Sequence, residues 1–250
     1  MESSTTIETE MRRDGPVGEG PRGPLSAIVP TLNAEATLPA TLAALAAGTA
    51  AGLLGEVLVV DGGSRDGTET LAAAAGAVVL SAPRGRGRQL AAGATAAGGA
   101  WLLFLHADTV LAPDWTAVAE SFMNEVGPSG ARAAVFRFAL DDEDPRARRI
   151  ERLACWRGRV LGLPYGDQGL LISKDFYRRL GGYRPLELME DVDLVRRIGR
   201  RRLARLDVDA VTSAARYRRD GWTWRPLCNL LLLGLYFLGL PSRALSRLYR

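Results

Sequence analysis

Short apolar runs alternate with helical patterns along the first half of the chain. Continuous apolar runs of strand length lie at residues 25–30, 55–61, 77–82 and 100–108. Segments with apolar residues at helical spacing separate these runs, at 35–48, 67–76 and 88–99. Because the strands are apolar on both faces, helices must cover both sides of the sheet. The pattern therefore predicts an α/β fold, with a doubly wound, mostly parallel sheet and helices on both faces.

The second half of the chain continues this alternation less regularly. It predicts a strand at 133–140, an arginine-rich amphipathic helix at 145–162, a strand and a short helix within 169–183, and a helix that begins near Glu190. At the other end of the chain, residues 1–23 are polar and rich in Gly and Pro, without the apolar core of a signal peptide. We expect these residues to form a disordered leader.

The composition is that of an ordinary globular protein with an unusual choice of basic residue. The chain has 250 residues, 47% of them hydrophobic, and a formal net charge of +4. Lys174 is the only lysine, so the basic balance reflects arginine-rich composition as much as nucleic-acid contact. Basic and aromatic residues do not alternate in a stripe, and we expect no nucleic-acid partner. Cys155 and Cys228 are outside metal or redox spacing, which predicts buried thiols in a cytoplasmic protein.

The stretch VLVVDGGSRDGT, residues 57–68, places a carboxylate at the end of an apolar strand. Gly62 and Gly63 follow Asp61 and keep side chains out of the space beyond the strand, where doubly wound sheets bind their ligands. A carboxylate there can accept a hydrogen bond from a ribose hydroxyl or a pyrimidine imide, although Asp and Gly are equally ordinary turn residues. Polar residues also follow the strands that end near Pro30 and His106, which favours one shared cleft.

Five motifs, in order along the chain, carry a resemblance to a known family. They are SAIVPTLNAEATL, VLVVDGGSRDGT, PRGRGRQLAAGA, LLFLHADT and ELMEDVDL. The chain resembles family 2 glycosyltransferases of the GT-A fold. It is most similar to the short bacterial branch that reads His-Ala-Asp where many relatives read Asp-x-Asp, often labelled arsenosugar-biosynthesis glycosyltransferase. The resemblance implies a GT-A domain at 24–215, with a nucleotide-binding half at 24–112 and an acceptor-binding half at 113–215.

The resemblance also implies which residues bind a nucleotide sugar, most often one of uridine diphosphate (UDP). Uracil would lie at Pro30 and Asp61, and the ribose near Glu35. A guanidinium suits phosphate oxygens, so the Gly-rich loop would contact the base or the diphosphate. A solvated basic turn is the alternative interpretation of this loop. The complete implied set is Pro30, Glu35, Asp61, Gly63, Arg84, Arg86, His106, Ala107 and Asp108.

A divalent cation is the implied cofactor. Breaking the bond to a diphosphate leaving group requires stabilisation of its charge, and Mg²⁺ or Mn²⁺ held by carboxylate oxygens supplies this. Asp108 would hold the cation. Where many relatives carry a second acid, this chain has His106, its only histidine, which could be a ligand, a phosphate donor or a packed residue.

The second half would supply the catalytic base and the acceptor site. Inverting transfer requires a carboxylate that removes a proton from the acceptor, and the resemblance gives this role to Asp191, with Glu190 as its neighbour. The YGDQG turn places Asp167 and Gln168 at the acceptor, a hydroxyl or carboxylate on a small molecule or a lipid, although the segment could equally be a plain loop. The implied enzyme is a hexosyltransferase-like inverting glycosyltransferase. A nucleotide-sugar-binding protein without transfer activity and a nucleotidyltransferase are the alternatives.

The carboxyl-terminal segment, 216–250, has a different character. Residues 227–240 are strongly apolar and arginines flank them, but a spanning helix needs about 20 apolar residues. With Trp222 and Trp224 at the headgroup level, residues 222–250 fit a peripheral contact with the inner face of the plasma membrane. A helix packed on the domain, or an oligomer contact, is the alternative.

Overall fold

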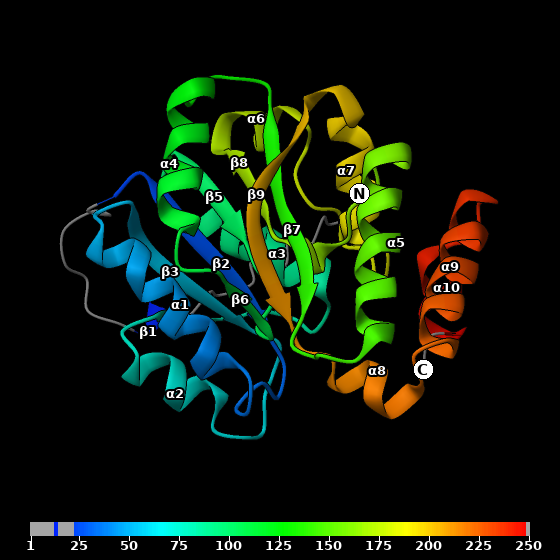
Figure 1. Cartoon of the computed structure of the whole chain (residues 1–250). Coiled ribbons are helices and arrows are strands. Elements are labelled where there is room, and N and C mark those ends of the chain that lie inside the picture. The colour runs from blue at the N-terminus through cyan, green and yellow to red at the C-terminus, as the bar shows by residue number, and fades with distance from the viewer. Residues whose placement is uncertain (1–12, 15–22, 249–250) are drawn as a thin grey trace, which may run out of the picture.

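A single curled sheet forms the centre of the molecule (Figure 1). The computed structural model describes residues 13–14 and 23–248, and within them the sheet has nine strands in the order β1-β4-β3-β2-β5-β8-β7-β9-β6. The strands are β1 (Arg13–Asp14), β2 (Leu25–Thr31), β3 (Leu54–Asp61), β4 (Val78–Ser81), β5 (Trp101–Phe104), β6 (Thr109–Leu111), β7 (Ala133–Leu140), β8 (Leu170–Ser173) and β9 (Leu203–Thr212).

Strand direction follows from the helices between the strands. β4, β3, β2 and β5 run parallel to one another, as do β7 and β9. β1, β8 and β6 run antiparallel to their neighbours. The carboxyl ends of β4, β2 and β5 therefore meet the amino end of β8 at one edge of the sheet, which is where ligands bind in folds of this kind.

Helices cover both faces of this sheet (Figure 1). The larger helices are α1 (Leu38–Ala50), α3 (Arg86–Ala96), α4 (Trp115–Val126), α5 (Pro145–Leu161), α7 (Glu190–Ile198) and α9 (Trp224–Phe237). The shorter ones are α2 (Thr68–Ala74), α6 (Lys174–Arg179), α8 (Ala215–Asp220) and α10 (Ser242–Leu248), with single 3₁₀ turns at Gly166–Gln168 and Arg200–Arg202.

Alternation along β2 shows how the sequence builds two cores. Leu25, Ala27 and Val29 point to one face, where they pack with residues of α1, α2 and α4. Ile28 points to the other face and packs with α3, α6 and α7. Both faces are buried, so the predicted α/β fold with helices on both sides is confirmed.

Most predicted elements are present within a few residues, but several elements were missed. The hydrophobic pattern did not predict β6, α4, β9 or α8. β9 is long, but Arg205, Asp207 and Asp209 interrupt its apolar residues because that part of its face is open to solvent. α4 buries Trp115, Ala119, Phe122 and Met123, a helical spacing that would have identified it.

The two ends of the chain and the two cysteines can also be compared with the sequence predictions. Arg13 and Asp14 pair with β4, and the rest of the predicted leader, 1–12 and 15–22, lies outside the described residues. Cys155 and Cys228 are free thiols, but both are partly exposed, so the prediction that they are buried was wrong. None of the helices in the described part of the chain is both long enough and apolar enough to cross a bilayer.

The carboxyl-terminal helices pack on the domain. Leu232, Leu233 and Leu245, of α9 and α10, share an apolar cluster with Met189 and Val192 near the start of α7. The hydroxyl of Ser242 accepts a hydrogen bond from the backbone N–H of Leu188 and donates one to its carbonyl, both at 2.9 Å. These contacts hold the segment against the loop that precedes α7.

Candidate active site

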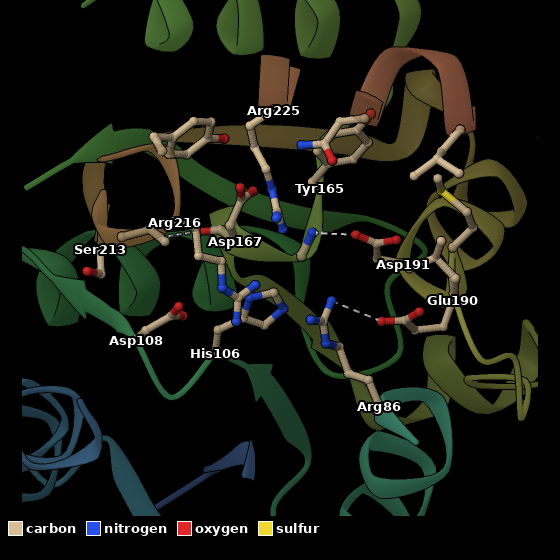
Figure 2. A pocket seen from close by; sticks show the side chains of 17 residues that line it. Arg86, His106, Asp108, Tyr165, Asp167, Glu190, Asp191, Ser213, Arg216 and Arg225 are labelled. Atoms are coloured by element: carbon tan, nitrogen blue, oxygen red, sulfur yellow. Dashed lines mark hydrogen bonds and ion pairs between the residues drawn. The ribbon is translucent and has the colours of Figure 1, made fainter. Parts of the chain in front are cut away.

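A cavity of about 120 Å³ lies at the edge of the sheet where β5 and β9 end. Segments far apart in the chain contribute its walls, and Figure 2 shows their side chains converging on one space. Six of the lining residues are ones that the sequence motifs predict at the site: Arg86, His106, Asp108, Asp167, Glu190 and Asp191. The structure therefore brings the predicted metal, acceptor and base positions together.

The first turn of α7 aims two carboxylates at the cavity. Met189, immediately before the helix, has φ 67°, a left-handed conformation that is uncommon for a residue with a side chain. The turn at Met189 places Glu190 and Asp191 at the helix amino terminus, where the helix dipole favours negative charge. Backbone strain of this kind is often found at functional sites.

Asp191 is held by backbone donors on both oxygens. Its Oδ2 accepts a hydrogen bond from the N–H of Gly166 at 2.7 Å, and its Oδ1 accepts one from the N–H of Val192 at 2.7 Å. A Cβ at Gly166 would lie 2.7 Å from Nε2 of His106 and 3.4 Å from Oδ2 of Asp191, so any larger residue would displace the ring or the turn. The carboxylate is thus oriented by the YGDQG turn, and it faces the cavity (Figure 2).

Glu190 and Arg86 form an ion pair across the cavity wall. Arg86 begins α3, and its Nη1 lies 3.3 Å from Oε1 of Glu190. Glu190 is buried, and burial raises the pKa of its carboxyl while the guanidinium of Arg86 opposes the shift. The pair joins the Gly-rich loop of the first half to the acidic helix of the second.

Asp167 lines the cavity, and its Oδ1 is buried. Burial raises the pKa of its carboxyl to about 6, and the negative charges of Asp191 and Asp108 act in the same direction. Within the described residues, its Oδ1 has no hydrogen-bond partner. A buried oxygen without a partner is a group that a ligand can satisfy.

His106 is a neutral imidazole at neutral pH. Burial lowers its pKa well below the usual range, and the charges of Arg86 and Arg216 add to the effect. A neutral imidazole can accept or donate a hydrogen bond and can bind a metal ion.

The side chains at the site could hold a divalent cation only if a substrate supplied further oxygen ligands. Among the residues that the structure describes, no three His, Cys, Asp or Glu side chains are placed to hold a metal ion by themselves. Asp108 and the unsatisfied oxygen of Asp167 offer hard oxygen ligands, and phosphate oxygens and water could complete an octahedral shell. The site thus fits Mg²⁺ or Mn²⁺ bound together with a diphosphate.

The carboxyl-terminal segment supplies a wall that the sequence analysis did not predict. Arg216 of α8 and Arg225, Asn229 and Leu232 of α9 all line the cavity. Arg225 lies 2.6 Å from the carboxylate of Asp220, and Figure 2 shows Arg216 beside His106. The sequence pattern associates the arginines that follow the domain with a membrane contact, and only the fold shows that Arg216 and Arg225 line the site.

Several predicted residues lie outside this cavity, in the region of the first strand ends. Asp61 is buried, and its carboxylate accepts hydrogen bonds from the hydroxyls of Thr31 and Ser64 and from the N–H groups of Gly63 and Ser64. Although burial alone would raise it, these hydrogen bonds hold the pKa of Asp61 below its usual value. The carboxylate therefore caps the turn, the structural role that the sequence left open, and its contact with uracil stays a prediction.

The other outlying residues also belong to this loop region or to neighbouring turns. Glu35 accepts a hydrogen bond from the N–H of Gly67 at 3.0 Å. Gly63 has φ 92°, Arg84 is exposed, and Gln168 is buried beside the cavity without lining it. Pro30 ends β2 next to Thr31, and Ala107 packs partly buried against one core.

Comparison with known proteins identifies the family. The sequence model of "Glycosyl transferase family 2" matches residues 26–163, more than half of the chain. The chain is a family 2 glycosyltransferase. The matched region ends before Asp167, Glu190 and Asp191, so the structure, not the family match, brings these residues to the cavity.

Solved structures show that this glycosyltransferase has the GT-A fold. Glucosyl-3-phosphoglycerate synthase from Mycobacterium tuberculosis, solved with Mn²⁺, UDP and glucosyl-3-phosphoglycerate, is 22% identical with a TM-score of 0.53, over 75% of this chain and 70% of the other. TarS 1–349 from S. aureus is 16% identical with a TM-score of 0.57, over 88% and 68%. TarS 1–349 in complex with UDP-GlcNAc is 16% identical with a TM-score of 0.54, over 75% of this chain and 58% of the other. None of the curated proteins compared with the chain matches it.

Proposed function

We propose that the protein is an inverting glycosyltransferase that moves a sugar from a UDP-sugar to an acceptor hydroxyl or carboxylate. One observation carries this proposal. α7 brings Asp191 and Glu190 to the same cavity as His106 and Asp108, which follow β5. A base and a diphosphate site in one cavity are what a single displacement requires.

A UDP-hexose is the proposed donor, which makes the enzyme a hexosyltransferase. Glucosyl-3-phosphoglycerate synthase was solved with UDP and TarS with UDP-GlcNAc, and both support this choice. In this arrangement uracil lies at Pro30 and Asp61, the ribose near Glu35, and Gly63 and Ala107 line the path of the donor. Arg84 and Arg86 contact the base or the diphosphate, because a guanidinium binds phosphate oxygens in a fork.

Asp191 is the proposed general base. Its carboxylate would take the proton from the acceptor as the acceptor oxygen attacks the anomeric carbon and the bond to the diphosphate breaks on the opposite side. Glu190 holds Arg86 in place at 3.3 Å. No carboxylate acts as a nucleophile, because a single displacement forms no covalent glycosyl-enzyme.

A divalent cation, Mg²⁺ or Mn²⁺, would be held by Asp108 together with the diphosphate, with Asp167 or His106 nearby. When bound, such an ion neutralises charge on the leaving diphosphate. The glucosyl-3-phosphoglycerate synthase structures contain Mn²⁺ or Mg²⁺, which supports the assignment.

The acceptor would bind against Asp167 and Gln168 and could be a small molecule or a lipid. The His-Ala-Asp motif favours the short branch labelled arsenosugar-biosynthesis glycosyltransferase. We also propose, from the apolar residues and arginines of the carboxyl-terminal segment, that residues 222–250 contact the inner face of the plasma membrane.

A donor screen tests the reaction. The purified full chain is incubated with a panel of UDP-sugars, and UDP release, with water accepting the sugar, is measured with Mn²⁺ and with a chelator. We expect release from at least one UDP-hexose, a strong dependence on Mn²⁺, and a fall of about 100-fold or more in Asp108→Asn. Asp175→Asn, a matched change on an exposed acid of α6, should leave the rate unchanged. Failure to turn over any UDP-sugar would contradict the proposal.

A further inference from the structure

Helix α5 presents apolar side chains and arginines together on its outer face. Leu153, Trp156 and Val160 are exposed, with 56% of Trp156 accessible, and they recur at the spacing of one helix face. Arg149, Arg152 and Arg159 are exposed on the same side. The opposite side is core, because Ala147, Ile150 and Ala154 pack beneath it. A helix that faces only water does not need an exposed tryptophan flanked by leucine and valine.

Helix α9 has a second exposed apolar stripe. Its inner side buries Leu232 and Leu233, while its outer side is a row of large side chains open to solvent. Leu238, just after the helix, is 80% accessible. The exposed residues at helical spacing are Trp224, Leu227, Leu230, Leu231, Phe237 and Leu238.

Contacts at both ends of α5 join the two stripes. At its amino end, the guanidinium of Arg146 lies 5.6 Å from the ring of Trp222, which leads into α9. At its carboxyl end, Arg157 stacks on Tyr165 at 3.5 Å, and Tyr165 packs against the cluster that contains Leu232. Figure 1 shows α5, α9 and α10 on the same side of the molecule. The two helices therefore lie on one side of the molecule (Figure 1) and are linked at both ends of α5.

This side of the molecule also concentrates positive charge. α5 contains six arginines and one acid, a net charge of +5, and residues 215–248 contain six arginines and one acid, also a net charge of +5. Since the whole chain carries only +4, the remainder has a net charge of −6. The sequence average hides this asymmetry.

We infer that the outer faces of α5 and α9 form a docking surface for an anionic lipid bilayer. Exposed apolar side chains beside arginines fit the boundary between headgroups and acyl chains, and an anionic leaflet supplies the complementary charge. Two copies of this surface would repel each other, and nucleic acid would leave the leucines exposed to water. The inference rests on the membrane contact proposed for 222–250 and extends it to α5, a helix inside the acceptor-binding half.

The surface borders the active site. α9 exposes Leu227 and Leu231 on one side and lines the cavity with Asn229 and Leu232 on the other. Docking in this orientation places the cavity next to the membrane surface.

Cosedimentation of the full chain with vesicles tests the inference. The vesicles are phosphatidylcholine, with or without about 30% phosphatidylglycerol. We expect binding to anionic vesicles at least about tenfold tighter than to neutral ones, and weaker binding in high salt. Leu153→Gln/Trp156→Gln in α5 and Leu227→Gln/Leu231→Gln in α9 should each lower the partition coefficient by about tenfold. Circular dichroism melting confirms that each variant is folded.

A charge-matched pair of variants tests the electrostatic part. Arg149→Gln/Arg152→Gln/Arg159→Gln should lower binding to anionic vesicles by about tenfold. Arg132→Gln/Arg178→Gln/Arg201→Gln removes the same charge elsewhere and should leave binding unchanged.

Three results would overturn the inference. The first is a full chain that does not bind anionic vesicles. The second is an α5 double variant that binds vesicles as tightly as the parent, together with an α9 double variant that binds them more weakly. That result would limit the membrane contact to 222–250. The third is a dimer, seen by sedimentation velocity, that the α5 substitutions dissociate. UDP release in the absence of vesicles reports on the transfer reaction separately.

Discussion

At the scale of single residues, Asp167 is a partly buried acid whose protonation is coupled to folding. Its pKa is raised from 3.8 to about 6, so between these values the folded chain holds a proton that the unfolded chain has lost. Its contribution to the free energy of unfolding is therefore greatest at low pH and is lost as the pH rises through about 6.

Asp167→Asn should show this dependence directly. Removing the charge should increase the free energy of unfolding by roughly 2 kcal/mol at about pH 8 and by little at about pH 4. Urea unfolding of the metal-free protein at the two pH values measures the difference. If the substitution raised the free energy of unfolding as much at low pH as at high pH, Asp167 would not titrate in this range.

Gly166 is the other residue on which the geometry depends. In Gly166→Ala the new methyl group would lie 2.7 Å from Nε2 of His106, so the ring or the turn that orients Asp191 must move. We expect kcat to fall about 10–100-fold, because small displacements of reacting groups are costly. His106 is the only histidine, so its isolated imidazole NMR signals should shift as well. An unchanged spectrum together with full activity would contradict the close contact.

At the scale of elements, α8 and α9 make the site depend on the end of the chain. Arg216 of α8 lines the cavity, and its charge helps to lower the pKa of His106. A guanidinium in this position suits the diphosphate or an anionic acceptor.

Arg216→Ala should therefore have two effects. The pKa of His106 should rise, since a neighbouring positive charge is removed, and NMR titration of the single histidine measures this shift. The value of kcat/KM should fall by about tenfold or more, as expected for the loss of a charged hydrogen-bond donor. Arg201→Ala, an exposed control in the 3₁₀ turn before β9, should change neither quantity. A His106 pKa equal to that of the parent would place Arg216 away from the ring.

The elements also show what could be predicted from the sequence. The hydrophobic pattern alone predicts strands that are buried on both faces, such as β2, β3 and β5. It also predicts α5, whose start is marked by Asp144 and Pro145. β9 was missed because part of its face is exposed to solvent, so polar residues interrupt its apolar run. Leu232 and Leu233 of the carboxyl-terminal segment pack against Met189 and Val192 of the domain, which is the alternative that the sequence left open.

At the scale of the whole molecule, the motifs predicted the positions of the acids but not all of their surroundings. Asp108 and Asp191 meet in one cavity, because β5 and α7 approach the same edge of the sheet. Asp61 also caps its own turn, and it accepts a hydrogen bond from Thr31 in the neighbouring strand, a contact that no local motif indicates. Arg216 and Arg225 carried no local signal, because only the return of the chain places them at the site.

We propose above all that Asp191 acts as the base of a glycosyl transfer in this cavity. The most direct measurement compares Asp191→Asn with the parent by turnover and by UDP titration calorimetry. Asn keeps the shape of the side chain but cannot take a proton, so we predict that kcat falls by about 10²–10⁴-fold while UDP affinity changes little. Transfer by the variant at the parent's rate would remove Asp191 from the mechanism.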